Sequence, residues 1–187
     1  MTDTEYLTDH FLIAMPQLDD PNFSQTVTYL CQHDAQGAMG ITINRPLGIG
    51  LGELLAQLEI RTDDESLIRQ PVYSGGPVQT SRGFILHSPA SLWDSTLEIN
   101  PQLSLTTSSD IFEAMVAGNG PEKTFVALGY SGWGAGQLEA EIMNNAWLHT
   151  RADYSILFDT EPGQRWPQAA AQLGIDINTL SHEPGHA

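Results

Sequence analysis

Four glycines lie in the stretch Gly129–Ile142, GYSGWGAGQLEAEI. The apolar residues 125–128 before it are typical of a buried strand, and residues 137–145 are typical of a helix. Glycine reaches backbone angles that a Cβ forbids, so the four glycines predict a tight turn between strand and helix. Binding sites are often built at such a junction, here at Gly129, Gly132, Gly134 and Gly136.

The turn has a functional and a structural interpretation. A helix N-terminus carries partial positive charge, so the turn can hold a small anion, with Tyr130 or Trp133 as an aromatic wall. The structural interpretation is close packing of backbone against backbone. The sequence favours the structural interpretation, because the stretch lacks the Lys-Ser/Thr ending of a phosphate-binding loop.

Two catalytic patterns are incomplete in the same stretch. It begins like the nucleophile elbow G-x-S-x-G, but Trp133 stands at the fifth position, which makes Ser131 a poor nucleophile. Glu139 and Glu141 resemble paired carboxylates, yet two residues turn a helix by about 200° and send the pair to opposite faces. We therefore expect no catalytic residue here, and we expect Glu141 on an exposed polar face opposite an apolar stripe of Leu138, Ile142 and Ala146.

Length and composition indicate one α+β domain over residues 1–187, with a core at 10–174 and a flexible tail at 181–187. The chain carries 23 acidic and 7 basic side chains, a formal charge of −16. Because the basic residues are scattered, direct binding to nucleic acid or to an anionic membrane is unfavourable.

The N-terminal region has no basic start, and its apolar run at residues 11–15 is far shorter than a signal core or a membrane span. Cys31 is the only cysteine, so no intramolecular disulfide can form. Both features predict a cytoplasmic protein.

The pattern of residue types predicts short strands and helices without a regular alternation of the two. Capping-box spacing of Asp110 and Glu113 marks the start of one helix, and Gly118 marks its end. The last helix shows apolar residues from Trp166 to Leu173, with Pro167 in its first turn. Expected strands are 11–15, 26–32, 39–43, 72–74, 83–87, 103–106 and 125–128, and expected helices are 51–58, 111–117, 137–145 and 166–173.

The cysteine and histidine residues give little indication of a catalytic thiol or a metal site. Cys31 and His33 share one face of a strand, so a thiol activated by imidazole is conceivable, but a lone cysteine is more often a small buried hydrophobe. The remaining histidines lack the spacing of metal ligands. We expect no metal and no cofactor.

Arg45 and Arg82 are unusual cations in an acidic chain. Each follows or begins a predicted strand, and a planar guanidinium suits a carboxylate or phosphate ligand. They can equally satisfy strand-end carbonyls or pair with Glu139 or Glu141, and the structural role is favoured slightly.

Long motifs resemble the bacterial YqgE/AlgH family from about Phe11 to Gly174. They include FLIAMPQLDDPNFSQTVTYLCQHDAQGAMGITINRP, YSGGPVQTSRGFILHS, DIFEAMVAGNGP and ALGYSGWGAGQLEAEIMNNAWL. The resemblance implies a single α+β domain with a bifurcated, mostly antiparallel sheet folded into a pseudo-barrel and flanked by helices. It implies no reaction: one branch carries a regulatory label concerned with alginate production.

The sequence favours a regulatory or binding protein that acts through a small-molecule or protein partner, and it leaves the oligomeric state open. An enzyme that acts on a small anionic substrate at Gly129–Gly136 is the alternative. The tentative ligand-binding residues are Arg45, Arg82, Tyr130, Gly132, Trp133, Gly134, Glu139 and Glu141.

Overall fold

A computed structural model describes residues 5–180 of the chain. These residues form two compact units, and strand β9 (Thr124–Gly134) contributes to both. Unit 1 comprises residues up to Asn44 and from Ser131 onward, and unit 2 comprises Arg45–Tyr130. The expectation of one domain over residues 1–187 stays a prediction, and the expected tail at 181–187 lies outside the described residues.

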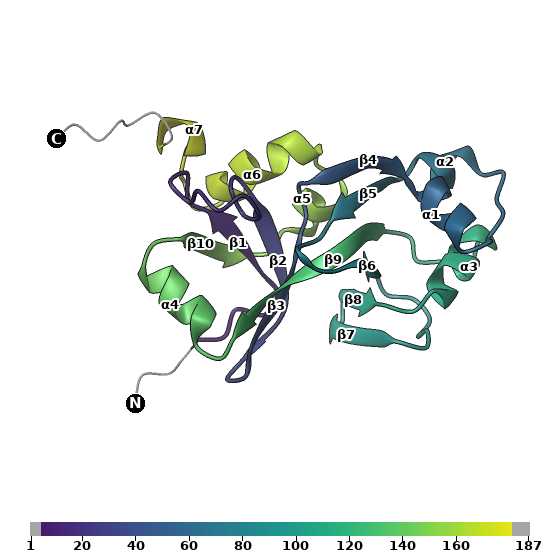
Figure 1. The fold of residues 1–187 in the computed structure, drawn as a ribbon, viewed down its shortest axis with the longest axis horizontal. Coiled ribbons are helices and arrows are strands. Elements are labelled where there is room, and N and C mark those ends of the chain that lie inside the picture. The colour runs from purple at the N-terminus through teal and green to yellow at the C-terminus, as the bar shows by residue number, and fades with distance from the viewer. Residues whose placement is uncertain (1–4, 181–187) are drawn as a thin grey trace. The chain divides into compact units, whose positions relative to one another are not determined.

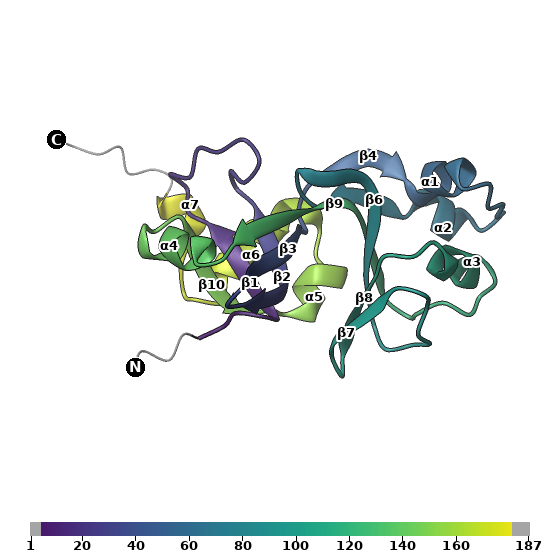
Figure 2. The same ribbon diagram turned by 60° about the horizontal axis from the view of Figure 1, so that its bottom comes forward.

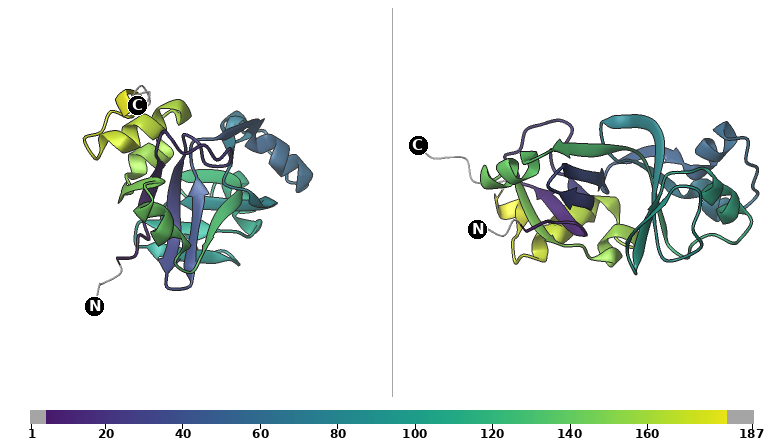
Figure 3. Two further views of the ribbon diagram at one scale, coloured as in Figure 1. Left: turned by 60° about the vertical axis from the view of Figure 1, so that its left-hand side comes forward. Right: turned by 90° about the horizontal axis from the view of Figure 1, so that it is seen from below.

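Unit 1 is built on an antiparallel sheet in the order β10-β1-β2-β3-β9. Nearly every residue of β1 and β2 is buried, which explains their continuous apolar sequences. Helix α6 packs on β1 and β2, and α4 packs on β3 and β10 (Figures 1 and 3). The elements are β1 (His10–Ala14), β2 (Val27–Asp34), β3 (Gly37–Thr42), β10 (Trp147–Arg151), α4 (Gln137–Met143), α5 (Tyr154–Phe158), α6 (Pro162–Ala171) and α7 (Ile177–Leu180).

Unit 2 contains a second sheet in the order β4-β5-β9-β6-β8-β7, in which only β5 and β9 run parallel. Helices α1 and α3 bury apolar residues against this sheet (Figure 2). The elements are β4 (Pro46–Gly50), α1 (Leu51–Gln57), α2 (Glu65–Arg69), β5 (Pro71–Ser74), β6 (Val78–His87), β7 (Thr96–Asn100), β8 (Leu103–Thr106) and α3 (Asp110–Val116).

The predicted turn at Gly129–Gly136 is wrong for most of its length. Strand β9 continues to Gly134, because Gly132 and Gly134 pair with Met39 and Gly37 of β3. Only residues 135–136 form the turn, and Gly136 reaches α4 with a φ of 75°. Neither Gly132 nor Gly134 has a positive φ, contrary to the expectation of a tight glycine turn.

Three further expectations need correction. Strands β4, β7 and β10 and helices α2, α5 and α7 were not expected. Strand β4 carries a proline and two glycines, which only a strand at a sheet edge tolerates well, and the three helices are too short to show helical periodicity. Asp110 is the first residue of α3 instead of its cap, since Ser109 precedes the helix. Helix α6 begins at Pro162, so Pro167 lies inside it. The exit of α3 at Gly118 is confirmed, with a φ of 80°.

His87 is the last residue of β6, and its side chain is buried. Both of its ring nitrogens make hydrogen bonds. Its Nδ1 lies 2.9 Å from the carbonyl oxygen of Ser88, so Nδ1 must carry the proton and donate. Its Nε2 then accepts from the Thr106 hydroxyl at 2.7 Å, and Thr106 in turn lies 2.9 Å from the Thr96 hydroxyl. Burial lowers the pKa of His87 and so favours the neutral imidazole, whose Nε2 acts as this acceptor.

Among residues 5–180, no helix is both long and apolar enough to cross a lipid bilayer.

The first prediction concerns Gly129, which has a φ of 81°. A Cβ there would lie 2.4 Å from the carbonyl oxygen of Gly76, so backbone would have to move. Gly129→Ala should lower the free energy of unfolding by more than about 1 kcal/mol, measured by denaturant unfolding. Gly134→Ala is the control, because its Cβ would meet only the Gln137 side chain at 3.8 Å. Equal stability of the two variants would contradict this account of the strand.

The second prediction concerns pH. Burial lowers the pKa of His87 below its ordinary value of 6.5, and the hydrogen bond to Ser88 opposes this only in part. The unfolded chain therefore takes up a proton as pH falls below 6.5 while the folded chain resists it, so stability should fall with acidification in that range. Burial lowers the pKa of His149 as well, with the same sign. His87→Gln removes one titrating group, and its unfolding midpoint should depend less steeply on pH than that of the wild type; an unchanged slope would refute the role of His87.

Candidate functional site

The predicted ligand-binding residues divide between the two units. Gly132, Trp133, Gly134, Glu139 and Glu141 belong to unit 1. Arg45, Arg82 and Tyr130 belong to unit 2. A cleft that brings the arginines to the glutamates stays a prediction.

Glu139 is bound to a buried histidine of β2. The Leu7 N–H donates to His33 Nδ1 at 2.9 Å, which leaves the proton on Nε2, and Nε2 lies 2.6 Å from Glu139 Oε1. Desolvation raises the pKa of Glu139, but hydrogen bonds from its own backbone and from His33 outweigh it, so the net pKa is lowered. Both nitrogens of His33 are thus engaged, and the ring joins the segment around Leu7 to α4.

His33 is therefore not placed to activate Cys31. Burial raises the pKa of the Cys31 thiol, which keeps it protonated and unreactive. The side chain is 2% exposed and lies where the pairing of β2 with β3 shifts register between Leu30 and Gln32. The interpretation of Cys31 as a small buried hydrophobe is confirmed.

The Glu141 carboxylate accepts hydrogen bonds from three side chains at the edge of the unit 1 core. Its Oε1 accepts from the indole N–H of Trp133 at 3.2 Å and of Trp147 at 3.1 Å. Its Oε2 accepts from Gln137 at 3.0 Å, and Gln137 accepts from the Gly134 N–H at 2.9 Å. The expectation of an exposed Glu141 is wrong, because two tryptophans half-bury it. The expectation that Glu139 and Glu141 face different surroundings is confirmed.

Ser131 is fully buried on the inward face of β9. Within the described part of the chain its hydroxyl has no hydrogen-bond partner, and neither a base nor an orienting group contacts it. This environment agrees with the expectation that Ser131 is a poor nucleophile.

The predicted residues of unit 2 make local contacts. The Arg82 guanidinium donates to the Thr107 hydroxyl at 3.1 Å and lies 5.8 Å above the Phe84 ring. Tyr130 packs on the same ring, with centroids 5.3 Å apart. The Arg45 carbonyl accepts from the Ser74 N–H at 2.8 Å. The side-chain contacts support the structural role of Arg82 and Tyr130, whereas the Arg45 contact is made by its backbone and leaves the role of its side chain a prediction.

A groove of about 950 Å³ lies along α1 and α2 in unit 2, and none of the proposed ligand-binding residues lines it. Its apolar lining consists of Gly50, Gly52, Leu55, Ala56, Ile60 and Ile68. Its polar lining consists of Glu53, Glu59, Arg61, Thr62 and Asp63.

Close contact between α1 and α2 forms one wall of the groove. The Leu51 N–H donates to the Gln70 carbonyl at 2.7 Å. A Cβ on Gly50 would lie 2.3 Å from the Ile68 carbonyl oxygen, and a Cβ on Gly52 would lie 2.9 Å from Ile68 Cγ2. Only glycine at both positions lets the helices approach this closely.

The loop between the two helices forms the rim. Glu59 leaves α1 with a φ of 59°, and the Ile60 N–H turns back to the Leu55 carbonyl at 2.9 Å, as in a Schellman motif. Asp64 then caps α2 by accepting from the Ser66 N–H at 2.9 Å. Both ends of the loop are therefore held by hydrogen bonds. A hollow of this kind depends on the approach of two helices, which residue types do not reveal.

Among the residues that the structure describes, no group of three or more histidine, cysteine, aspartate or glutamate side chains is arranged to hold a metal ion.

The third prediction concerns Glu141. Glu141→Leu keeps the side chain's size but leaves two indole N–H groups without their acceptor, which should cost about 2 kcal/mol of unfolding free energy. Glu113→Leu on the exposed face of α3 is the matched control and should change stability little. Denaturant unfolding followed by tryptophan fluorescence measures both variants. A loss at Glu141 no larger than at Glu113 would contradict the structural role.

Comparisons of the sequence with a family model and with known proteins agree on one family. A family model described as DUF179, AlgH-like, matches residues 11–178. A UPF0301 protein of Thioalkalivibrio sulfidiphilus is 53% identical over all of both chains, and one of Hahella chejuensis is 55% identical over 97% of this chain and 96% of its own.

Two solved structures share the fold. The solution structure of the AlgH protein from Pseudomonas aeruginosa is 50% identical over all of both chains, with a TM-score of 0.81. A Corynebacterium diphtheriae protein, DIP2367, is 17% identical over 98% of this chain and 95% of its own, with a TM-score of 0.74, and shows likeness of fold alone. The expected α+β fold with a bifurcated, mostly antiparallel sheet is confirmed. The chain belongs to the AlgH-like family.

Proposed function

We propose that this protein is a regulatory protein that acts by binding a segment of another protein in the groove along α1 and α2 of unit 2. The groove itself is the observation that carries the proposal. Its volume of about 950 Å³ lies at the upper end of the range of ligand sites, roughly 300–1,000 Å³. It combines an apolar floor with a polar rim, which is the usual composition of such sites.

The groove is also a site whose shape is held in place. Leu51 and Leu55 of α1 are fully buried in the unit 2 core, and Ile60 and Leu67 pack against that core from either side of the loop. A rigid groove loses little conformational entropy when it binds, which favours recognition of a partner.

The enzyme alternative at Gly129–Gly136 receives less support. The Glu139 carboxylate is hydrogen-bonded to His33, and the Glu141 carboxylate accepts hydrogen bonds from two tryptophans. The Ser131 side chain is buried. An anion at the start of α4 would also lie beside Glu139, which stands in the first turn. These groups stabilise unit 1 and leave few polar atoms for a substrate.

A cytoplasmic location and a protein partner fit the same proposal. Cys31 is a buried free thiol, which a reducing compartment preserves. The charge of −16 opposes direct contact with nucleic acid or anionic lipid, so regulation would pass through a protein.

The fourth prediction tests the groove by filling it. Ala56 is exposed on α1 and lines the groove, so Ala56→Trp should fill the space without disturbing the core. Gln57→Trp is the matched control, because Gln57 is the next residue, is exposed, and does not line the groove. Both variants should unfold within about 0.5 kcal/mol of the wild type.

Each variant is then returned to a bacterial strain that lacks the gene, and its fitness is measured in competition with the parent strain. Ala56→Trp should behave like the empty vector, and Gln57→Trp like the wild type. Full complementation by a stably folded Ala56→Trp protein would refute the proposed function.

A further inference from the structure

We infer that the segment bound in the α1–α2 groove is basic and extended, with lysine or arginine side chains alternating with aliphatic ones. This inference rests on the proposed function and adds the chemistry of the partner. It follows from the charges on the rim, their spacing and the apolar floor between them.

The rim carries three carboxylates and one guanidinium, from Glu53, Glu59, Asp63 and Arg61. All four residues are exposed. Within the described residues, no hydrogen bond or ion pair engages the three carboxylates, since the ion pairs there join His33 to Glu139 and Arg69 to Glu65. The rim therefore presents free negative charge to a ligand.

The C-terminal end of α1 adds to the negative electrostatic potential of the rim carboxylates. The C-terminus of a helix carries partial negative charge, and α1 ends beside Glu59 and Ile60 on the groove. An anionic ligand would bring its charge against three carboxylates and a helix C-terminus. A cationic ligand would gain from all of them.

The spacing of the carboxylates favours an extended chain over a small cation. Glu53 stands in the first turn of α1 and Glu59 lies beyond its last residue, so more than one helical turn, about 5.4 Å along the axis, separates their backbones. Side chains at positions i and i+2 of an extended peptide lie about 7 Å apart on one side, and long cationic side chains bridge the difference. A single small cation would reach only one of the two carboxylates.

The floor of the groove suits the side chains between the cations. Leu55, Ile60 and Ile68 are apolar and lie between the charged positions of the rim. In an extended peptide, alternate side chains point to opposite sides, so aliphatic residues can enter the floor while the basic residues reach the rim. The alternation of basic and aliphatic side chains in the bound segment thus follows from the acidic rim and the apolar floor of the groove.

The test is an NMR titration of the full-length, ¹⁵N-labelled protein with the peptide acetyl-Leu-Arg-Leu-Arg-Leu-amide. Amide resonances of residues 50–68 should shift, and the dissociation constant should rise with salt, since exposed charges are screened. The same peptide with glutamate in place of arginine should leave these resonances unchanged. Spermidine should bind more weakly than the arginine peptide, because it offers no side chains for the floor.

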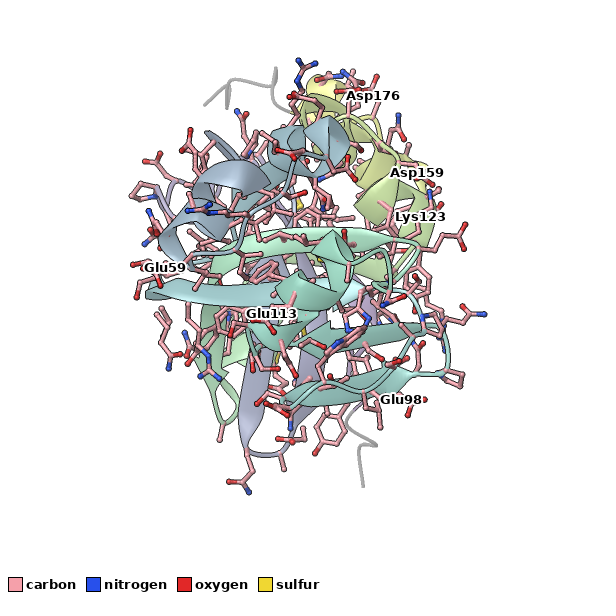
Figure 4. The ribbon with its side chains drawn as sticks, turned by 90° about the vertical axis from the view of Figure 1, so that its right-hand side faces the viewer. Glu59, Glu98, Glu113, Lys123, Asp159 and Asp176 are labelled. Carbon is pink, nitrogen blue, oxygen red and sulfur yellow. The ribbon has the colours of Figure 1, made fainter. Side chains whose placement is uncertain are left out.

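A charge-matched pair of triple variants locates the effect. Glu53→Gln with Glu59→Gln and Asp63→Asn should weaken binding of the arginine peptide by about tenfold or more. Glu98→Gln with Glu113→Gln and Glu122→Gln changes the net charge equally in unit 2, at exposed residues outside the groove, and should bind like the wild type. Figure 4 shows that Glu98 and Glu113 come from elements other than that of Glu59.

Every other outcome overturns the inference. Binding of the glutamate peptide in the groove would leave the proposed function intact and refute the basic partner. Spermidine as tight a ligand as the arginine peptide would refute a peptide occupant. Equal weakening in both triple variants would show non-specific attraction to an acidic protein, and no shift at millimolar arginine peptide would refute the inference outright. Failure of the proposed function itself is seen separately, as full activity of Ala56→Trp in cells.

Discussion

Strand β9 is the constraint on which the rest of the structure depends. Its first residues pair with β5 and β6 in unit 2, and its last residues pair with β3 in unit 1. A strand of this length keeps its backbone hydrogen bonds only if its glycines stay extended where they pair, as Gly132 and Gly134 do. Gly129 is the exception, and the neighbouring backbone of Gly76 leaves no room for a side chain there. The glycine-rich sequence therefore serves strand pairing more than a turn.

The two glutamates after this strand illustrate how a polar residue can look functional and be structural. Glu139 holds a neutral His33, and Glu141 holds two indole groups at the edge of the unit 1 core. A buried donor without an acceptor is costly, so these carboxylates are needed for folding whether or not they also bind a ligand. The proposed function therefore assigns recognition to the groove of unit 2 and not to these two glutamates.

The sequence predicted the fold class and much of the secondary structure, whereas its ligand-binding residues stay a prediction. Strand β8 was predicted at its observed residues, and the ends of β1, β2 and β3 to within two residues, because apolar residues that are buried on both faces of a sheet form continuous runs. β4 and α2 were missed because an edge strand with Pro46 and a five-residue helix show no periodicity. The groove could not be predicted, since it depends on how closely Gly52 approaches Ile68 in space. The role of Glu141 was hidden for the same reason: Trp133 and Trp147 reach it through the fold.

The central claim is that a protein partner occupies the α1–α2 groove of unit 2. The most direct measurement is a set of intermolecular nuclear Overhauser effects between methyl groups of this protein and the partner in a purified complex. The account predicts contacts from the partner to the methyl groups of Ala56, Ile60 and Ile68. Contacts confined to unit 1, such as to Leu138 and Ile142 of α4, would contradict it.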